Sequence, residues 1–416
     1  MENPLQLHLT NSSPAAFELA LTQMHAVGFE ALVLSFGSGF KFEMKPNDPY
    51  IRTLTKMTAK ASALGIEVGG YDLTVLDRGH GGYGGNVGDQ WDRVDNTTGR
   101  LSADACYASG WRDKLEKMLF HVVKTCNLSI VLTDGPYGGG VCGATNHTHH
   151  HDANDSVFAQ TRLQQEFYRT LFRQGKFVRQ PDHYYFDGGN HAPLGYSEQQ
   201  YSMPRWTDLT VSRQGLLDDA YEKPVVLGWM FLPMKPYHAG GDGASFEPYM
   251  DHLQAYEFAM AQYLGSGCGM TYRGDKLFDK EGDASYTMVK KRVAWFKRYR
   301  EIITSDIVHI SRPTAQGLDA FVHVNAKTLG PTKAMALVFN PTTEPIASSV
   351  VLPLYYSGLD DRVSVVVGDE GEGKPGSLMR LERDYSLQVA VALAPKSTTW
   401  IAVSAASSSA LSDVLL

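Results

Sequence analysis

Two aspartates follow short apolar segments, and each stands directly before a glycine. Asp134 follows Ile-Val-Leu-Thr, and Asp187 follows Tyr-Tyr-Phe. The glycine lets the backbone turn sharply and lets a ligand approach closely. Two carboxylates that face one cleft can cleave a glycosidic bond, because one attacks or stabilises the anomeric carbon and the other protonates the leaving oxygen. The pair therefore predicts sugar chemistry, although Asp-Gly is also a common turn dipeptide.

The proton donor of such a pair has three candidates in this chain. Asp187 is the first, and Glu198, in the segment Gly-Tyr-Ser-Glu, competes with it. Asp208 is the third, and it is also explained as a carboxylate in the first turn of a helix. The donor must hold its proton while Asp134 stays ionised, so the environments of the two groups must differ.

The elements that would position these acids alternate between apolar strands and amphipathic helices over residues 1–304. We expect strands at residues 5–9, 31–35, 66–73, 128–133, 183–186, 225–231 and 269–272, with a weaker one near 192–196. The intervening helices are expected at residues 13–27, 50–64, 111–125, 156–174, 207–221, 248–264 and 285–303. Repeated β/α units with continuous apolar strands predict an α/β fold, a (β/α)8 TIM barrel. A doubly wound open sheet is the alternative, but no Gly-x-Gly-x-x-Gly turn follows the first strand.

The pattern changes after the last expected helix. Short alternating segments lie at residues 320–324, 334–339, 347–353, 362–367, 387–394 and 398–403, separated by Gly, Pro, Asp and Asn. Such spacing is typical of antiparallel strands. We therefore expect a C-terminal antiparallel β-sandwich domain over residues 305–404, followed by a flexible Ser/Ala-rich tail over residues 405–416.

In a barrel of this kind, functional side chains lie just beyond the carboxyl ends of the strands. Aromatic side chains can stack on the C–H face of a sugar ring. Arg273 can hold a hydroxyl or an acidic substituent through two parallel hydrogen bonds. The residues expected to bind substrate are Tyr71, Asp72, Trp91, Tyr137, His150, Trp229, Tyr272 and Arg273.

A histidine-rich stretch, Asn-His-Thr-His-His-His-Asp over residues 146–152, suggests metal binding, because dense imidazoles can ligate transition ions. Adjacent histidines cannot all face one centre, and the four cysteines match no zinc spacing. We therefore predict no metal site and no cofactor, with His150 on a rim loop that contacts sugar hydroxyls. A metal-assisted barrel hydrolase that uses this loop stays an alternative.

Composition restricts the possible partners and locations. The chain has 416 residues, 43% of them hydrophobic, and a net charge of −7. An acidic balance argues against nucleic acid and anionic membranes as partners, and no apolar run reaches transmembrane length. A carbohydrate substrate is the expected partner, and the oligomeric state stays open. Five Asn-X-Ser/Thr triplets are compatible with a secreted or lysosome-like location, but the first residues do not form a signal peptide, so the compartment stays open.

The order of these features resembles the α-galactosidase-type glycoside hydrolases and related α-glycosidase barrels. A strand ends in a nucleophile-like Asp134, a further carboxylate follows, a later strand carries Trp229, and a β domain closes the chain. Two motifs depart from that family: Leu132 stands where those enzymes carry the lysine of Lys-x-Asp, and Arg205 to Asp208 forms Arg-x-x-Asp, one residue shorter than the usual acid/base motif.

The resemblance implies a glycoside hydrolase that cleaves α-linked glycosides of oligo- or polysaccharides with retention of configuration. It places Asp134 as the nucleophile. A barrel that binds carbohydrate without cleaving it is the second interpretation.

Overall fold

The computed structural model describes residues 4–84, 87–134, 139–179, 196–197, 203–222, 229–368, 371 and 374–406. The chain divides into two compact units. Unit 1 comprises Met1–Tyr196 with Thr271–Leu277, and unit 2 comprises Ser197–Met270 with Phe278–Leu416. None of the helices in the described ranges combines the length and apolar character that a membrane crossing requires.

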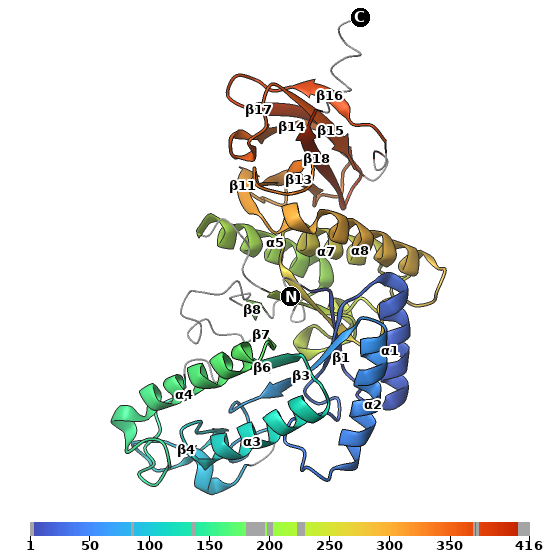
Figure 1. The fold of residues 1–416 in the computed structure, drawn as a ribbon. Helices are drawn as coiled ribbons and strands as arrows, with labels where there is room; N and C mark the ends of the chain where they lie inside the picture. The colour runs from blue at the N-terminus through green and yellow to red at the C-terminus, as the bar shows by residue number, and fades with distance from the viewer. Residues whose placement is uncertain are drawn as a thin grey trace, which may run out of the picture. The chain divides into compact units, whose positions relative to one another are not determined.

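Unit 1 alternates strands and helices in the order expected of β/α repeats (Figure 1). In chain order its elements are β1 (Gln6–Leu9), α1 (Pro14–Val27), β2 (Ala31–Leu34), α2 (Pro49–Ala63), β3 (Glu67–Leu73), η1 (Asp89–Trp91), β4 (Asp92–Val94), β5 (Leu101–Ala105), α3 (Gly110–Thr125), β6 (Ile130–Asp134), α4 (Ala153–Arg173), β7 (Phe177–Arg179), and β10 (Gly269–Gly274), which begins in unit 2.

The strands form one sheet in the order β7-β6-β3-β2-β1-β10-β9-β8, where β8 is Tyr196–Ser197 and β9 is Trp229–Pro233. Neighbouring strands from β7 through β1 to β10 run parallel. The carboxyl ends of these strands therefore meet at one edge of the sheet. A Cβ atom on Gly69 of β3 would lie 2.2 Å from the carbonyl oxygen of Ile130, so glycine is required for this close approach of β3 and β6.

Local signals in the sequence define the helix ends. The Ser13 side chain accepts a hydrogen bond from the Ala16 amide and Pro14 occupies the first turn of α1, while Gly28 ends the helix with φ of 85°. Helix α4 begins with a capping box formed by Asp152 and Asp155. Helices α1 and α2 lie side by side against β1 and β3 in Figure 1.

Unit 2 contains four α-helices among its described residues and the strands of the C-terminal domain. The helices are α5 (Arg205–Glu222), α6 (Gly241–Ala244), α7 (Leu253–Gly265) and α8 (Ala284–Ile303), with the short turn η4 (His238–Gly240). The guanidinium of Arg213 on α5 forms a buried ion pair with Asp319 and lies 3.8 Å from the ring centroid of Phe339. This pair fixes α5 to the β strands that follow, and an uncompensated buried charge would result from removing either partner.

The C-terminal strands form two antiparallel sheets. The larger has the order β11-β12-β13-β18-β15-β16, and the smaller pairs β14 with β17. Their side chains form one buried apolar cluster, with contributions from Val322, Ala336, Leu352 and Val389. The bounds are β11 (Asp306–Ser311), β12 (Asp319–Val324), β13 (Thr332–Asn340), β14 (Ile346–Pro353), η5 (Tyr355–Ser357), β15 (Arg362–Val367), β16 (Ser377–Arg380), β17 (Ser386–Leu393) and β18 (Ser397–Ala405).

The predicted fold class, a barrel sheet followed by a C-terminal antiparallel β domain, is confirmed. The β4–β5 hairpin was not among the expected elements. Strands β7, β11 and β16 were also missed. The strand expected at residues 183–186 and most of residues 192–196 lie outside the described residues, as do residues 407–416 of the expected tail.

Candidate functional site

The side chains that point into the barrel follow from strand register. The buried cluster inside the sheet contains Ala31, Val33, Tyr71, Leu73, Ile130 and Leu132. Alternate residues of a strand share a face, so Asp134 points to the same side as Ile130 and Leu132. Asp134 is the last residue of β6 and is partly exposed. Its carboxylate therefore lies on the interior face at the carboxyl edge of the sheet, which is the position expected from the sequence.

The adjacent strand orients this carboxylate. The Tyr71 hydroxyl on β3 donates a hydrogen bond to Oδ2 of Asp134 at 2.7 Å. The Tyr71 ring is buried, with its centroid 5.0 Å from that of His8 on β1. Next to Asp134 in sequence, the Thr133 hydroxyl points the other way and hydrogen-bonds the Tyr168 hydroxyl on α4 at 2.7 Å. The end of β6 is thus held from both faces.

A polar layer lies inside the barrel below this carboxylate. His8 is opposite Val33 on β2 and opposite Arg273 on β10, so all three side chains point into the interior. His8 is buried and Arg273 is partly exposed. Two residues before His8 on the same strand, Gln6 donates a hydrogen bond to the Thr271 hydroxyl at 3.4 Å. Sequence reasoning missed His8, although a histidine inside the apolar strand Gln-Leu-His-Leu was a usable signal.

Asp72 and Tyr272 have the opposite orientation. Both alternate with interior residues and are buried on the outer face of the sheet. Oδ1 of Asp72 lies 3.6 Å from Nη1 of Arg78, and the Arg78 guanidinium also contacts the Glu43 carboxylate. Burial raises the pKa of Asp72 to about 7 and lowers the pKa of Arg78 to about 10.

The Tyr272 ring packs edge-on against Phe29 at 4.9 Å between centroids, and burial raises the pKa of its hydroxyl. Neither side chain is accessible to a sugar. The expectation that Asp72 and Tyr272 bind substrate is therefore corrected: both are structural residues on the outer face of the sheet. A strand pattern read without its register does not distinguish the two faces.

The remaining predicted site residues are described only in part. Asp187, Glu198 and Tyr137 lie outside the described residues, and for Trp229 only the backbone, in β9, is described. Trp91 ends η1 and packs against Trp111, with 6.4 Å between the ring centroids. The ammonium of Lys114 lies 5.3 Å from the Trp91 ring centroid.

Asp208, the third candidate donor, lies in the first turn of α5 in unit 2. Its side chain is buried, and its Oδ1 atom has no hydrogen-bond partner among the described residues. Burial raises the pKa of Asp208 to about 8. A buried carboxyl group of this kind stays protonated at neutral pH.

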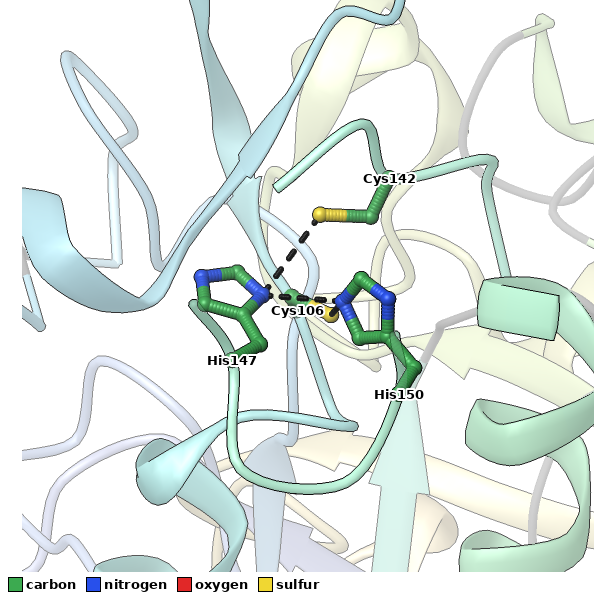
Figure 2. A group of neighbouring side chains, drawn as sticks. All are labelled: Cys106, Cys142, His147 and His150. Atoms are coloured by element: carbon green, nitrogen blue, oxygen red, sulfur yellow. Dashed lines mark hydrogen bonds between the residues drawn. The ribbon is translucent and has the colours of Figure 1, made fainter. Parts of the chain in front are cut away.

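Four buried side chains converge in a second cluster of unit 1: Cys106, Cys142, His147 and His150. The loop between β6 and α4 supplies the last three, and Cys106 follows directly after β5. Figure 2 shows the four side chains pointing toward one another. Both cysteines are free thiols. This cluster corrects the expectation for His150, which is buried in it rather than placed on a rim to contact sugar hydroxyls.

The histidine-rich stretch therefore divides by side-chain direction. His147 and His150 point inward to the cysteines, while His149 binds the Asp113 carboxylate on α3 at 2.9 Å and His151 is exposed. A cysteine 36 positions before Cys142 completes the group, which is why local spacing gave no sign of it.

Comparison with known proteins supports the fold. No family model matches the chain, and no curated protein matches it in sequence. Among solved structures, the galactosidase domain of the α-galactosidase–sucrose kinase AgaSK matches with a TM-score of 0.65 and 13% identity, over 97% of this chain and 55% of that one. A GH36 α-galactosidase AgaA variant from Geobacillus stearothermophilus, in complex with raffinose, matches with a TM-score of 0.64 and 15% identity, over 97% and 56%.

An α-amylase from Geobacillus thermoleovorans, complexed with acarbose, matches with a TM-score of 0.57 and 11% identity, over 97% of this chain and 99% of that chain. The chain spans about half the length of the galactosidases it matches. At these identities the comparisons establish the fold alone, which is the one found in these α-galactosidase and α-amylase structures.

Proposed function

We propose that the chain is a glycoside hydrolase that cleaves α-linked glycosides of oligo- or polysaccharides by a retaining double displacement. The observation that carries this proposal is Asp134, a partly exposed carboxylate at the carboxyl edge of the barrel sheet, oriented by the Tyr71 hydroxyl at 2.7 Å. The fold shared with α-galactosidases and an α-amylase supports the same reaction class.

In the first step, a carboxylate oxygen of Asp134 attacks the anomeric carbon while the bond from that carbon to the leaving oxygen breaks. Asp187 or Glu198 donates a proton to the leaving oxygen, so the aglycone departs as a neutral alcohol. In the second step, the same residue takes a proton from water, and the water oxygen replaces Asp134 at the anomeric carbon. Two inversions give net retention.

The polar layer inside the barrel gives this site its substrate contacts. Arg273 points into the interior from β10, in register with His8 on β1. We assign Arg273 to holding a sugar hydroxyl or an acidic substituent, since its guanidinium donates in a planar fork. The Tyr71 hydroxyl keeps the Asp134 carboxylate aligned for attack, which lowers the entropic cost of reaching the reactive geometry.

A screen of chromogenic α- and β-glycosides against the full chain tests the proposal. We expect turnover of at least one α-glycoside, and a loss of about 10⁴-fold or more in kcat for Asp134→Asn. Asp251→Asn is the matched control, because Asp251 is an exposed aspartate of unit 2. Equal activity of the two variants would remove Asp134 from the mechanism.

The stereochemical course and the donor need separate measurements. Proton NMR of the first product formed should show the α anomer, and formation of the β anomer would indicate inversion. Variants Asp187→Asn and Glu198→Gln are compared on substrates with good and poor leaving groups. The true donor variant should lose about 10²- to 10⁴-fold on a poor leaving group and far less on a dinitrophenyl glycoside, which needs no protonation.

The second interpretation, a barrel that binds carbohydrate without cleaving it, has its own outcome. It predicts saturable glycan binding by calorimetry with no turnover of any glycoside in the screen.

A further inference from the structure

We propose that Cys106, Cys142, His147 and His150 form a structural Zn²⁺ site with four protein ligands. The four candidate ligand atoms all lie within 4.8 Å of one another, and all four residues are buried. Two thiolates and two imidazoles are a donor set that zinc prefers, and tetrahedral sites with four protein ligands are the structural kind.

Three of the six distances between the ligand atoms are close to the edges of a tetrahedron around one ion. Cys142 Sγ lies 3.6 Å from His147 Nδ1, Cys106 Sγ lies 3.6 Å from His150 Nε2, and the two nitrogens are 3.1 Å apart. Zinc bonds of about 2.3 Å to sulfur and about 2.0 Å to nitrogen give tetrahedral edges of about 3.6 Å for S···N and about 3.3 Å for N···N. The observed edges agree with these values to within a few tenths of an ångström.

The ring of His150 is held in the tautomer that a metal requires. Its Nδ1 lies 3.0 Å from the backbone carbonyl oxygen of Asp152, which can only accept a hydrogen bond. Nδ1 therefore carries the proton and donates it, which leaves the lone pair of Nε2 directed at the cluster. A carbonyl that orients a ligating histidine through its second nitrogen is a common arrangement around protein-bound zinc.

The sulfur of Cys142 has similar support. The Val94 amide donates a hydrogen bond to Sγ of Cys142 at 3.5 Å, and the Cys142 amide donates one to the Ser156 hydroxyl at 3.0 Å. A backbone amide that donates to sulfur stabilises the thiolate that binds a metal. Cys142 is thus held in position by one hydrogen bond to the β4–β5 hairpin and another to α4.

The ion would join segments that lie far apart along the chain. Cys106 ends the β4–β5 hairpin, whose strands pair from Asp92 to Ala105. The other three ligands lie in the loop that follows Asp134 and leads into the capping box of α4. The zinc would therefore fix residues 142–150, in the segment that follows the proposed nucleophile. All four coordination positions are filled by protein, so no position is left for a reactive water, and the site does not support the metal-assisted hydrolase.

The test begins with the wild-type full chain and does not depend on its hydrolase activity. The protein is purified without chelator from cells grown with zinc, and elemental analysis should give one zinc per chain. X-ray absorption at the zinc edge should give two sulfur and two nitrogen neighbours. Replacement by Co²⁺ should give the intense visible bands of a tetrahedral ion and a thiolate charge-transfer band in the near ultraviolet.

Variants locate the ion. Cys106→Ser and Cys142→Ser should lose zinc, and His150→Cys should keep one zinc with three sulfur neighbours. Cys126→Ser and Cys268→Ser are matched controls, because Cys126 and Cys268 are also buried free thiols but do not belong to the cluster. Both controls should keep one zinc per chain.

Three results would overturn the proposal. The first is a wild-type chain that takes up no zinc or cobalt when either ion is supplied. The second is metal loss from Cys126→Ser or Cys268→Ser with retention in Cys142→Ser. The third is a Cys106–Cys142 disulfide in peptides of the native protein. Because these readouts are metal content and spectra, a missing glycosidase activity would leave the zinc site standing, and a missing zinc would leave the hydrolase standing.

Discussion

Two regions of unit 1 use polar side chains in opposite ways. At the end of β6, the Asp134 carboxylate is partly exposed and accepts a hydrogen bond from Tyr71 on a neighbouring strand. In the cluster of Cys106, Cys142, His147 and His150, all four groups are buried and face one another. A group that reacts with substrate must stay accessible, whereas a group that holds a fold together gains from exclusion of water.

The two regions are also linked through the chain. Asp134 and Cys142 lie eight positions apart in the sequence, and His147 and His150 follow Cys142 before α4 begins. If the cluster of Cys106, Cys142, His147 and His150 binds zinc as proposed, it would restrain the chain near Asp134 without contacting substrate. Two kinds of measurement can separate the reactive role of Asp134 from the structural role of the cluster: how readily small molecules reach each group, and what is lost when each is changed.

The largest expected effect comes from removing the Asp134 side chain. Asp134→Gly should lose about 10⁴-fold or more in kcat, because the attacking carboxylate is absent. Added azide should restore turnover and yield a glycosyl azide of inverted configuration, since the small anion can occupy the space that the missing carboxylate leaves and attack the anomeric carbon once. Mass spectrometry and NMR of the product provide the measurement. Failure of azide, formate and acetate to restore any turnover would contradict an open nucleophile site.

The buried cluster of Cys106, Cys142, His147 and His150 should be less accessible to added reagents than the partly exposed Asp134. In native buffer, a chelator should release zinc from the chain slowly, and the release rate should rise with urea in parallel with the unfolding rate, because the ligands are reached only after opening. A zinc-sensitive dye follows release and circular dichroism follows unfolding. Rapid release from the fully folded chain would show that the cluster is not closed.

A buried carboxyl in unit 2 provides a pH test of burial. Burial raises the folded pKa of Asp208 to about 8 from its ordinary value of 3.8, so the native state binds more protons than the unfolded state between these values. The free energy of unfolding therefore falls as pH rises through this range. Asp208→Asn cannot ionise, so its stability relative to wild type should increase by about 3 kcal/mol between pH 5 and pH 8. Urea denaturation at the two pH values measures this, with Asp251→Asn as the control. A relative stability that does not change with pH would contradict the raised pKa.

The smallest effect concerns the orientation of the nucleophile. Tyr71→Phe keeps the buried ring and removes the hydroxyl that donates to Asp134. We expect kcat to fall about tenfold or somewhat more with little change in KM, since a hydrogen bond to an ionised carboxylate contributes about 1.5 kcal/mol or more. Thermal unfolding should shift little, because the packing against His8 is preserved. A Tyr71→Phe variant with wild-type kcat would show that the hydrogen bond does not align the carboxylate.

Much of the fold could be predicted from local patterns. The apolar segments of β1, β2, β3 and β6 and the helix that follows each gave the parallel sheet, because strand and helix periodicities differ and their alternation implies crossovers. Helix boundaries such as Ser13 and Gly28 were equally local. The C-terminal domain followed from short alternating segments, although β11 and β16 were missed because their patterns are less regular.

The functional residues divided differently. The position of Asp134 could be predicted because a carboxylate at the end of an apolar strand is a local signal with a fixed place in a barrel. Asp72 has the same local signal and faces outward to Arg78, because register, which is set by pairing with neighbouring strands, decides the face. His8 became a candidate site residue only when β1 was seen opposite Arg273.

The sequence by itself determined the alternation of elements and the acid that ends β6, because both depend on residues close together in the chain. Only the tertiary structure decided which strand-end side chains face the interior. It also brought Cys106 close to Cys142, His147 and His150. The physical reason is that a cluster of candidate ligands is defined by convergence in space, and residues that converge need share no spacing along the chain.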